Sequence, residues 1–428
     1  MTRAFAAALL LAIALLTAAE PERLRFGRFG AVTLYRAGPN PAHVVLLLSG
    51  DDGWDEPMVA IAQALAVHGA LVIGVDTTGY EKALALSAEP CAYPAGELES
   101  LSQFVQKRLG RPSYRVPFLV GVSSGAALAY AALLQAPPNT FRAGLASGFR
   151  PELALSRPFC GGHGLVSRPT SDGKSTALAP AAGLEPAWTV LSADTGGAQP
   201  LAARFAELAA RSDPPRLELA ADISDLPLIE VAPSGPAADA LAVILSGDGG
   251  WASLDREVGG VLAARGIPVI GMDSLQYFWR RRTPDESAAA LERILRHAVG
   301  AWPGRRIALV GYSRGADVLP FMVSRLPADL RARIALVALL GPGPSAEFEF
   351  RISDWLSSAV GPDALPIAPE AEKLRGLRVL CVYGHDDTES LCRELDPTLA
   401  TRDERPGNHH FDGGYAAIGA RIAQELAR

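Results

Sequence analysis

The chain has little of what several protein classes require. Only 4 of its 428 residues are cysteine, and their spacing does not match that of a zinc site. The net charge of −6 argues against a broad nucleic-acid-binding face. Arg280–Arg282 is the best candidate for a local basic patch, but a solvated basic turn or a salt-bridged cluster is the more common explanation of such a run. After the N-terminus there is no long apolar run of the kind that spans a bilayer. What remains, 49% hydrophobic and 20% charged residues, is typical of a globular protein with a sizeable core.

The one long apolar run lies at the N-terminus and is typical of a secretory signal peptide, residues 1–19. Arg3 supplies the positive charge, Ala4–Leu16 the apolar segment, and Thr17–Ala19 the small residues before cleavage. An uncleaved anchor is the alternative, but the run is shorter than the roughly 20 apolar residues that cross a bilayer. We therefore expect an exported, soluble mature protein.

Export makes disulfides possible among the four cysteines. Three pairings exist. Cys381 and Cys392 are close in sequence and flank one expected loop, so we pair them with each other. Cys91 and Cys160 would then join two parts of the N-terminal half.

Three blocks of sequence occur twice in the same order, which indicates an internal duplication. The matching blocks are Leu46–Trp54 with Val243–Trp251, Val72–Asp76 with Val269–Asp273, and Leu119–Ala126 with Leu309–Ala316. We therefore predict two related domains, residues 20–215 and 216–428, with a boundary near the turn-rich Asp213–Pro215.

Short apolar runs alternate with helical patterns in each half, as expected of a mainly parallel sheet with helices on both faces. In the second half we predict a helix over Ser287–Val299. The predicted strands of that half are Leu241–Leu245, Pro268–Met272, Ile307–Val310, Ile334–Leu340 and Arg378–Tyr383.

The pentapeptide Gly311–Gly315 lies between a predicted strand and the helical stretch Ala316–Arg325. A G-x-S-x-G in that context is the nucleophile elbow of α/β-hydrolases, and Ser313 would be the nucleophile. The fold class that follows is α/β, a tandem duplication of an α/β-hydrolase-like domain.

In this fold the acid and the histidine follow the serine in that order. Asp387 comes just after a predicted strand and is our choice of acid, with Asp386 as the alternate; both could instead cap a turn or helix. His409 is the preferred base and His410 the alternate. A metal site of these histidines with Asp412 is disfavoured, because adjacent histidines rarely face one site and no HExxH-type spacing is present.

An oxyanion hole needs backbone donors. We predict the N–H of Arg314 and an amide of the glycine-rich loop Ser246–Trp251, at Asp248. The glycines let that loop turn its amides toward a substrate carbonyl. A phosphate-binding loop is disfavoured because no Gly-Lys-Ser/Thr follows, and we expect no cofactor.

The N-terminal half keeps only part of this set. Ser123 lies in a second elbow and Asp194 is at the expected place of the acid, but no histidine follows it in that half. His163 precedes Asp194 and is in the wrong order. We predict an inactive copy that binds, shields or positions something.

Several longer motifs resemble the VirJ/AcvB family of periplasmic, virulence-associated bacterial proteins. The C-terminal half resembles the single-domain VirJ form and the whole chain the two-domain AcvB form. The motifs that carry the resemblance are Leu245–Trp251, Tyr277–Trp279, Arg282–Pro284, Gly311–Phe321, Arg325–Pro327 and Phe348–Phe350.

The resemblance implies a periplasmic enzyme that hydrolyses lysyl-phosphatidylglycerol, an aminoacylated phospholipid of the membrane surface, with Ser313 as nucleophile. It also implies an association with type IV secretion components and transferred single-stranded DNA. The alternatives are therefore a non-catalytic binding or chaperone-like factor for secreted cargo, and a carboxylesterase of other specificity.

A cationic substrate predicts an acidic pocket, for which Asp248, Asp273 and Asp317 are candidates. Asp317 could instead brace the nucleophile helix, and Asp273 could end its strand in a turn. Tyr277, with the two aromatic residues after it, could contact acyl chains or headgroups; the three could equally be split between core and surface.

Overall fold

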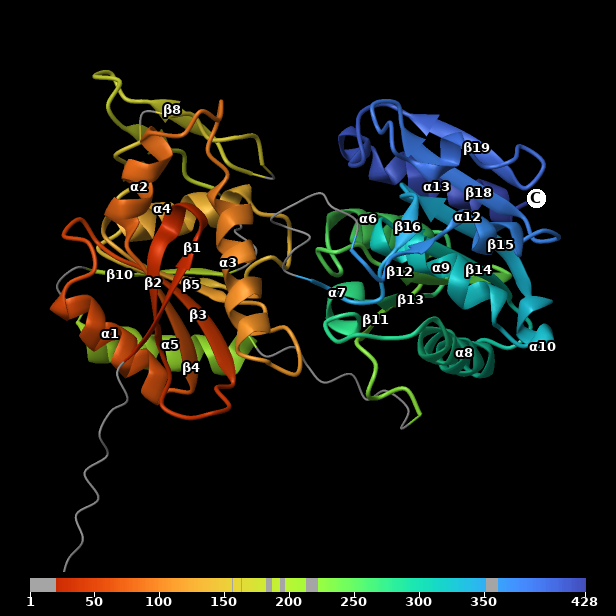
Figure 1. Ribbon diagram of the computed structural model, residues 1–428, viewed down its shortest axis with the longest axis horizontal. Coiled ribbons are helices and arrows are strands. Elements are labelled where there is room, and N and C mark those ends of the chain that lie inside the picture. Colours follow the sequence, from red (N-terminus) through yellow and green to blue (C-terminus); the bar gives the residue numbers. More distant parts are fainter. Residues whose placement is uncertain are drawn as a thin grey trace, which may run out of the picture.

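The computed structural model describes residues 21–155, 157–162, 164–181, 187–192, 197–212, 222–351 and 361–428. It contains two α/β domains side by side (Figure 1). The predicted signal peptide and the predicted boundary at Asp213–Pro215 lie outside the described residues. In the part that is described, no helix combines the length and the apolar character needed to cross a bilayer.

Seven strands form the sheet of the N-terminal domain: β1 (Glu22–Phe26), β2 (Gly30–Tyr35), β3 (His43–Leu48), β4 (Ala70–Val75), β5 (Phe118–Val122), β6 (Gly144–Ser147) and β10 (Trp188–Leu191). Their order is β1-β2-β4-β3-β5-β6-β10. Strand β2 is antiparallel to β1 and β4, and all other neighbours are parallel.

The C-terminal sheet also has seven strands: β11 (Leu228–Val231), β12 (Ala240–Leu245), β13 (Val269–Met272), β14 (Arg306–Tyr312), β15 (Ile334–Leu340), β18 (Val379–Gly384) and β19 (Ala400–Arg405). Their order is β11-β13-β12-β14-β15-β18-β19, with β11 alone antiparallel to its neighbour. All five predicted strands are confirmed within two residues, whereas β11 and β19 were not predicted.

Helices cover both faces of each sheet, as predicted. Those of the N-terminal domain are α1 (Glu56–Val67), α2 (Thr77–Ala85), α3 (Pro94–Arg108), α4 (Ser124–Gln135) and α5 (Ala198–Ser212). Those of the C-terminal domain are α6 (Ser253–Ala263), α7 (Ser274–Tyr277), α8 (Pro284–Ala301), α9 (Arg314–Ser324), α10 (Ala328–Arg331), α12 (Ala368–Glu372) and α13 (Tyr415–Leu426). In the first domain α1 and α5 share one core and α2, α3 and α4 the other; in the second, α6 and α13 lie opposite α8 and α9.

Short strands complete the fold. They are β7 (Glu152–Leu153), β8 (Ser167–Pro169) and β9 (Thr176–Leu178) in the first domain, and β16 (Ser345–Ala346) and β17 (Leu365–Pro366) in the second.

The predicted helix over Ser287–Val299 is α8, which begins three residues earlier. Thr283 caps its N-terminus in a capping box: its side chain accepts from the Glu286 N–H, and the Glu286 carboxylate accepts from the Thr283 N–H. The box satisfies backbone donors that have no partner within the helix, so the helix starts at Pro284.

The duplication extends to individual hydrogen bonds. Ser49 Oγ accepts from the Thr77 N–H at 2.9 Å, and Ser246 Oγ accepts from the Ser274 N–H at 2.9 Å, 197 residues later in each case. Each bond ties the loop after one parallel strand, β3 or β12, to the first residue of the helix that follows the neighbouring strand, α2 or α7. The two domains are therefore copies of one structural design.

Both predicted disulfides are confirmed. Cys91–Cys160 joins the segment before α3 to the region after β7, and Cys381–Cys392 joins β18 to the short 3-10 helix Leu391–Arg393. The second bridge closes the loop that contains Asp386 and Asp387.

A small aromatic cluster joins the domains. The ring of Trp279 stacks on Phe350 at 5.5 Å and lies 5.3 Å from Tyr114 of the N-terminal domain. The Trp279 indole N–H donates to the Arg111 carbonyl at 2.9 Å, and Lys107 Nζ lies 3.1 Å from the Glu349 carboxylate. The contact combines apolar burial with satisfied polar groups.

This cluster corrects both interpretations of the aromatic run. Tyr277, Phe278 and Trp279 are 4%, 0% and 1% exposed, so none of them forms a membrane-facing surface and the three are not split between core and surface. Phe278 and Tyr277 pack in the C-terminal core, and Trp279 packs between the domains.

Candidate active site

Ser313 lies in a strained turn between β14 and α9. Its φ and ψ are 51° and −121°, a conformation that costs a non-glycine residue about 1–3 kcal/mol. Close packing imposes the turn: a Cβ at Gly315 would lie 2.2 Å from the Leu245 carbonyl oxygen. Position 315 must therefore be glycine, and the serine is presented at the carboxyl end of the sheet, where α/β folds bind ligands.

His409 and Asp387 form a hydrogen-bonded pair. The distance from His409 Nδ1 to Asp387 Oδ2 is 3.1 Å, and the Asp387 side chain is only 13% exposed. A bond at Nδ1 leaves Nε2 as the nitrogen that can exchange a proton with a substrate or serine. Of the alternatives left open by the sequence, the structure brings together His409 and Asp387.

His410 has a different partner. Its Nδ1 lies 3.0 Å from the Tyr312 hydroxyl, and burial together with the neighbouring His409 lowers its pKa. Tyr312 also stacks on the His409 ring, with centroids 5.5 Å apart. Tyr312 therefore orients both histidines, a role that the sequence did not reveal although the residue belongs to the elbow motif.

The histidine lies beside the nucleophile. The Ser313 N–H donates to the Leu340 carbonyl at 2.9 Å at the end of β15, and the α-carbon of the next residue, Gly341, faces the His409 ring. No hydrogen bond joins Ser313 Oγ to His409 within the described residues, and such bonds are often long before a substrate is bound.

Close packing also explains why the acid and histidine loops meet. Gly384 ends β18, and a Cβ there would lie 2.1 Å from the Asn408 carbonyl oxygen. The edge strand β19 runs parallel to β18 and delivers the chain to that contact. The unpredicted strand is thus the element that positions His409.

Two backbone groups can serve as oxyanion donors. The N–H of Arg314 is at the first position of α9, where helical amides have no partner within the helix. The glycine-rich loop lies against the serine, because a Cβ at Gly247 would be 3.3 Å from Ser313 Cβ. These are the two segments in which the sequence predicted the hole, at Arg314 and Asp248.

The Arg314 side chain has a structural role that was not predicted. It is 7% exposed, pairs with the Asp248 carboxylate and donates to the carbonyls of Glu347 and Glu349 at 2.9 and 3.2 Å. The guanidinium therefore ties the glycine-rich loop to the segment after β16. Asp248, whose side chain is 46% exposed, already has a cationic partner.

The other two predicted acids brace loops. Asp273 accepts from the Gln276 N–H at 3.0 Å, which caps α7, and burial raises its pKa to about 6. Asp317 accepts from the Gly343 N–H at 2.7 Å, and burial raises its pKa to about 8. At neutral pH the Asp317 carboxyl is thus mostly protonated, which favours the bracing alternative over an ammonium contact for this residue.

Asp255 is a further buried acid near the oxyanion loop. It is 1% exposed, burial raises its pKa well above the usual range, and backbone N–H groups of Ala252 and Gly247 oppose that rise. The residue at the corresponding position of the N-terminal repeat, 197 residues earlier, is Met58. An acid that replaces an apolar residue between the repeats is a sequence signal that could have drawn attention to Asp255. Asp255 is placed to hold the loop amides in position.

The N-terminal domain retains the turn without the partners. Ser123 has φ 47° and ψ −112°, almost the values of Ser313. The predicted Asp194 and the misplaced His163 lie outside the described residues. Among the residues described, the sheet of this domain ends at β10 and has no counterpart of β19.

Comparison with known proteins identifies the domain that carries the site. A model of the bacterial virulence protein VirJ matches residues 239–428. Residues 239–428 belong to the VirJ family. The VirJ domain contains Ser313, Asp387 and His409, and the N-terminal α/β domain agrees with the predicted two-domain form.

Solved structures similar to about half of this chain include hydrolases and an esterase, and no curated protein matches the sequence. Est1E from Butyrivibrio proteoclasticus is 14% identical (TM-score 0.36) and covers 47% of this chain and 94% of its own. MenH from S. aureus is 10% identical, with a TM-score of 0.36, and the match covers 47% of this chain and 99% of MenH. The esterase Pf2001 from Pyrococcus furiosus is 16% identical, with a TM-score of 0.34, and the match covers 50% of this chain and 96% of the esterase.

Proposed function

We propose that the VirJ domain is a serine hydrolase that cleaves carboxylic esters, with Ser313 as nucleophile, His409 as base and Asp387 as the residue that orients the base. The observation that carries the proposal is the 3.1 Å bond between His409 and Asp387, beside a serine held in an elbow. Both disulfides agree with an exported enzyme in an oxidising compartment such as the periplasm.

The reaction follows from these positions. Ser313 Oγ attacks the ester carbonyl carbon while His409 Nε2 accepts the serine proton. The N–H of Arg314 and an amide of the glycine-rich loop stabilise the negative oxygen of the tetrahedral intermediate. His409 then gives its proton to the leaving alcohol, and water cleaves the acyl-enzyme by the same steps in reverse order.

We further propose that the ester is an aminoacylated phosphatidylglycerol, lysyl-phosphatidylglycerol in particular, so that the products are free lysine and phosphatidylglycerol. The family resemblance supports this substrate class. Asp248 offers a partly exposed carboxylate beside the glycine-rich loop for the aminoacyl ammonium groups, although it shares that charge with Arg314.

The test is to incubate the purified full chain with vesicles containing lysyl-phosphatidylglycerol and to measure free lysine. Ser313→Ala should abolish release, whereas Ser123→Ala, the same change in the same backbone turn, should not. A simple aryl ester tested in parallel separates general esterase activity from this substrate class.

Two results would redirect the proposal. Hydrolysis of the aryl ester alone would support a carboxylesterase of other specificity. Absence of Ser313-dependent hydrolysis of any ester would overturn the enzyme and favour the non-catalytic factor for type IV secretion cargo, including single-stranded DNA.

A further inference from the structure

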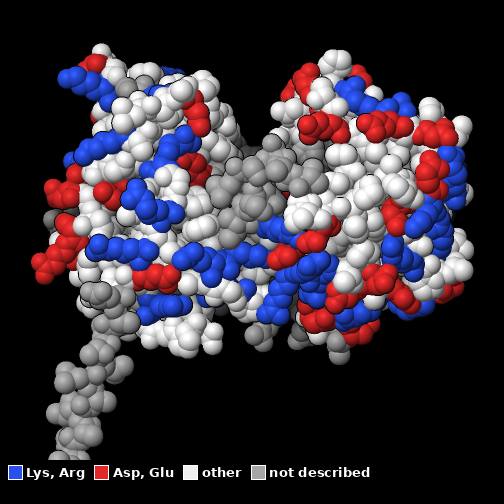
Figure 2. All heavy atoms as spheres, in the orientation of Figure 1, with Lys and Arg blue, Asp and Glu red and all other residues white. Residues whose placement is uncertain are grey.

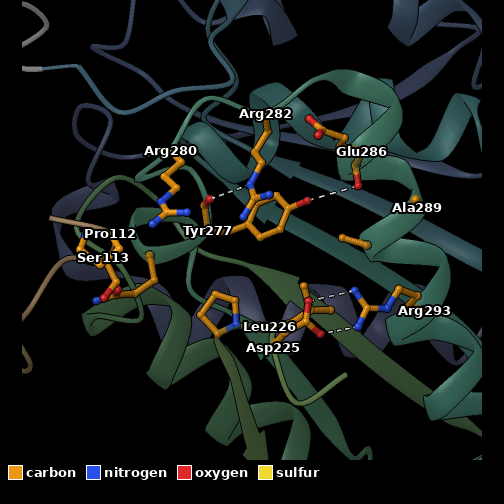
Figure 3. Close-up of a pocket in the computed structure, with 13 residues that line it drawn as sticks. Pro112, Ser113, Asp225, Leu226, Tyr277, Arg280, Arg282, Glu286, Ala289 and Arg293 are labelled. Carbon is orange, nitrogen blue, oxygen red and sulfur yellow. Dashed lines mark hydrogen bonds and ion pairs between the residues drawn. The ribbon is translucent and has the colours of Figure 1, made fainter. Parts of the chain in front are cut away.

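A cavity of about 470 Å³ lies where the two domains meet, away from the catalytic residues named above. Pro112 and Ser113 line it from the N-terminal domain, and Leu226, Tyr277 and α8 line it from the C-terminal half (Figure 3). Its volume is within the range of small-molecule sites, about 300–1,000 Å³. Nothing in the proposed ester hydrolysis uses it.

The acidic side chains of this cavity already have partners. Asp225 and Arg293 form a two-bond ion pair, drawn in Figure 3. The Glu286 carboxylate accepts from the Thr283 N–H at 2.8 Å in the capping box of α8. The lining therefore has three guanidinium groups against two carboxyl side chains, and one of the guanidinium groups, that of Arg293, is in an ion pair.

The other two guanidinium groups, those of Arg280 and Arg282, make no ion pair with a carboxylate in the described part of the chain. Arg282 lies over the Tyr277 ring at 4.8 Å, and its Nε donates to the Tyr277 carbonyl at 3.4 Å. Figure 3 shows Arg280 and Arg282 both beside Tyr277. Arg281, between them in sequence, does not line the cavity and pairs with Asp363 at 3.5 Å.

We propose that this cavity binds the phosphate group of an anionic ligand through Arg280 and Arg282, with the Ser113 hydroxyl as a third donor. Planar guanidinium groups match the oxygens of phosphate and donate charge-assisted hydrogen bonds to them. Stacking on Tyr277 holds Arg282 in place before the ligand arrives, which lowers the entropic cost of binding.

The surroundings favour an anion. Lys and Arg side chains lie on both domains near their junction, with Asp and Glu side chains among them (Figure 2), and positive charge close to the cavity raises the local concentration of anions. Ser113 belongs to the N-terminal domain and both arginines to the VirJ domain, so the site needs the two together. The N-terminal copy, which we predict to be inactive, thereby acquires a binding role. The phosphate can belong to a soluble phosphate ester or to a phospholipid headgroup.

The experiment measures binding by the full chain to two probes. Calorimetry with glycerol phosphate tests the soluble source, and flotation with phosphatidylglycerol vesicles against phosphatidylcholine vesicles tests the lipid source. Saturable binding to either supports the proposal and identifies the source. Arg280→Gln should weaken that binding about ten-fold, as expected for one charge-assisted contact, and the double variant with Arg282→Gln should weaken it further.

Arg281→Gln is the matched control and should bind like the wild type. Thermal unfolding of each variant shows whether it is folded. If Arg282→Gln disturbs the Tyr277 contact, the comparison of Arg280→Gln with the wild type still tests the proposal. Absence of binding to both probes would overturn the proposal. So would an equal loss in Arg280→Gln and Arg281→Gln, because it would indicate diffuse surface charge.

The result is independent of the ester hydrolysis. Ser313→Ala should retain phosphate binding at wild-type affinity, since Ser313 does not line the cavity. Loss of turnover with intact binding would therefore concern the proposed enzyme only, and loss of binding with intact turnover of a soluble ester would concern this site only.

Discussion

The two domains share their backbone turn and differ in the polar side chains around it. Ser123 and Ser313 have nearly equal dihedral angles, and glycine follows two residues later in both, packed against the end of the neighbouring strand. Ser313 has Tyr312, Arg314 and Asp317 near it in sequence. The corresponding positions near Ser123 are Val122, Ser124 and Ala127. The strained elbow is therefore a property of the fold, and it does not by itself indicate catalysis.

The second difference between the two domains is an edge strand, β19, at the end of the sheet. In the VirJ domain β19 and the loop after it bring a histidine to the carboxyl end of the sheet before α13 begins. In the N-terminal domain, as far as it is described, β10 is the last strand and α5 the next element. The proposed catalytic site thus depends on the edge strand β19 as well as on the elbow that holds Ser313.

The largest expected effect compares the two serines. Ser313→Ala should lower ester hydrolysis by about three orders of magnitude or more, because no other nucleophile is placed at the elbow, while Ser123→Ala should change it less than two-fold. Initial rates with an aryl ester measure both. Equal losses in the two variants would contradict the assignment of an inactive copy.

The next effect compares neighbouring acids. Asp387→Asn should lower the rate by about 10³-fold or more, since an amide no longer stabilises the protonated histidine. Asp386→Asn should have little effect, because His409 bonds to Asp387. The same rate assay decides: a greater loss at position 386 would reverse the assignment. His410→Ala is expected to retain activity, and His409→Ala is not.

The two disulfides allow a comparison of stability. Removing Cys91–Cys160, with a sequence separation of 69, should destabilise the N-terminal domain by about 4 kcal/mol; removing Cys381–Cys392, with a separation of 11, should cost the VirJ domain about 3 kcal/mol. Denaturant unfolding of the paired Cys→Ala variants measures both. Only the second pair closes the loop of Asp387, so only that variant should also lose esterase activity.

The last expected effect is the share of the pH dependence of stability that Asp317 contributes in the VirJ domain; Glu99, whose pKa burial also raises to about 8, contributes a similar share in the N-terminal domain. Burial raises the pKa of Asp317 to about 8, far above the unfolded value of about 3.9. Between these values the folded state holds a proton that the unfolded state does not, so stability falls as pH rises through the window. Asp317→Asn should remove this part of the dependence of stability on pH. The corresponding residue of the N-terminal domain, Ala127, has no titratable group and contributes nothing to it.

Unfolding of the wild type and Asp317→Asn at pH 5 and pH 9 measures that effect. The variant should gain stability relative to the wild type at the higher pH. An unchanged difference between the two proteins would show that Asp317 titrates normally. Other buried acids such as Asp273 contribute equally to both proteins and cancel in the comparison.

The sequence predicted the central strands well and missed β11 and β19. The central strands are continuous apolar runs because both of their faces are buried. Strand β19, with the sequence ATRDER, is a solvated edge strand rich in charged residues, and therefore carries no hydrophobic signal. Its absence from the prediction did not hide the histidine, because the order of serine, acid and histidine could be read without it.

The choice between neighbours could not be made from sequence. His409 and His410 differ by one position, and only the turn after Gly407 decides which ring faces Asp387. The interior role of Trp279 and the bracing role of the Arg314 side chain likewise depend on segments far apart in the chain.

The sequence by itself determined the duplication, the fold class, the disulfide pairs and the position of the elbow, because each depends on local spacing or on a repeated pattern. Only the tertiary structure decided which histidine meets which acid, which acids brace loops, and that a cavity opens between the domains. Those outcomes depend on distances between side chains from separate elements, and packing of the whole chain sets such distances.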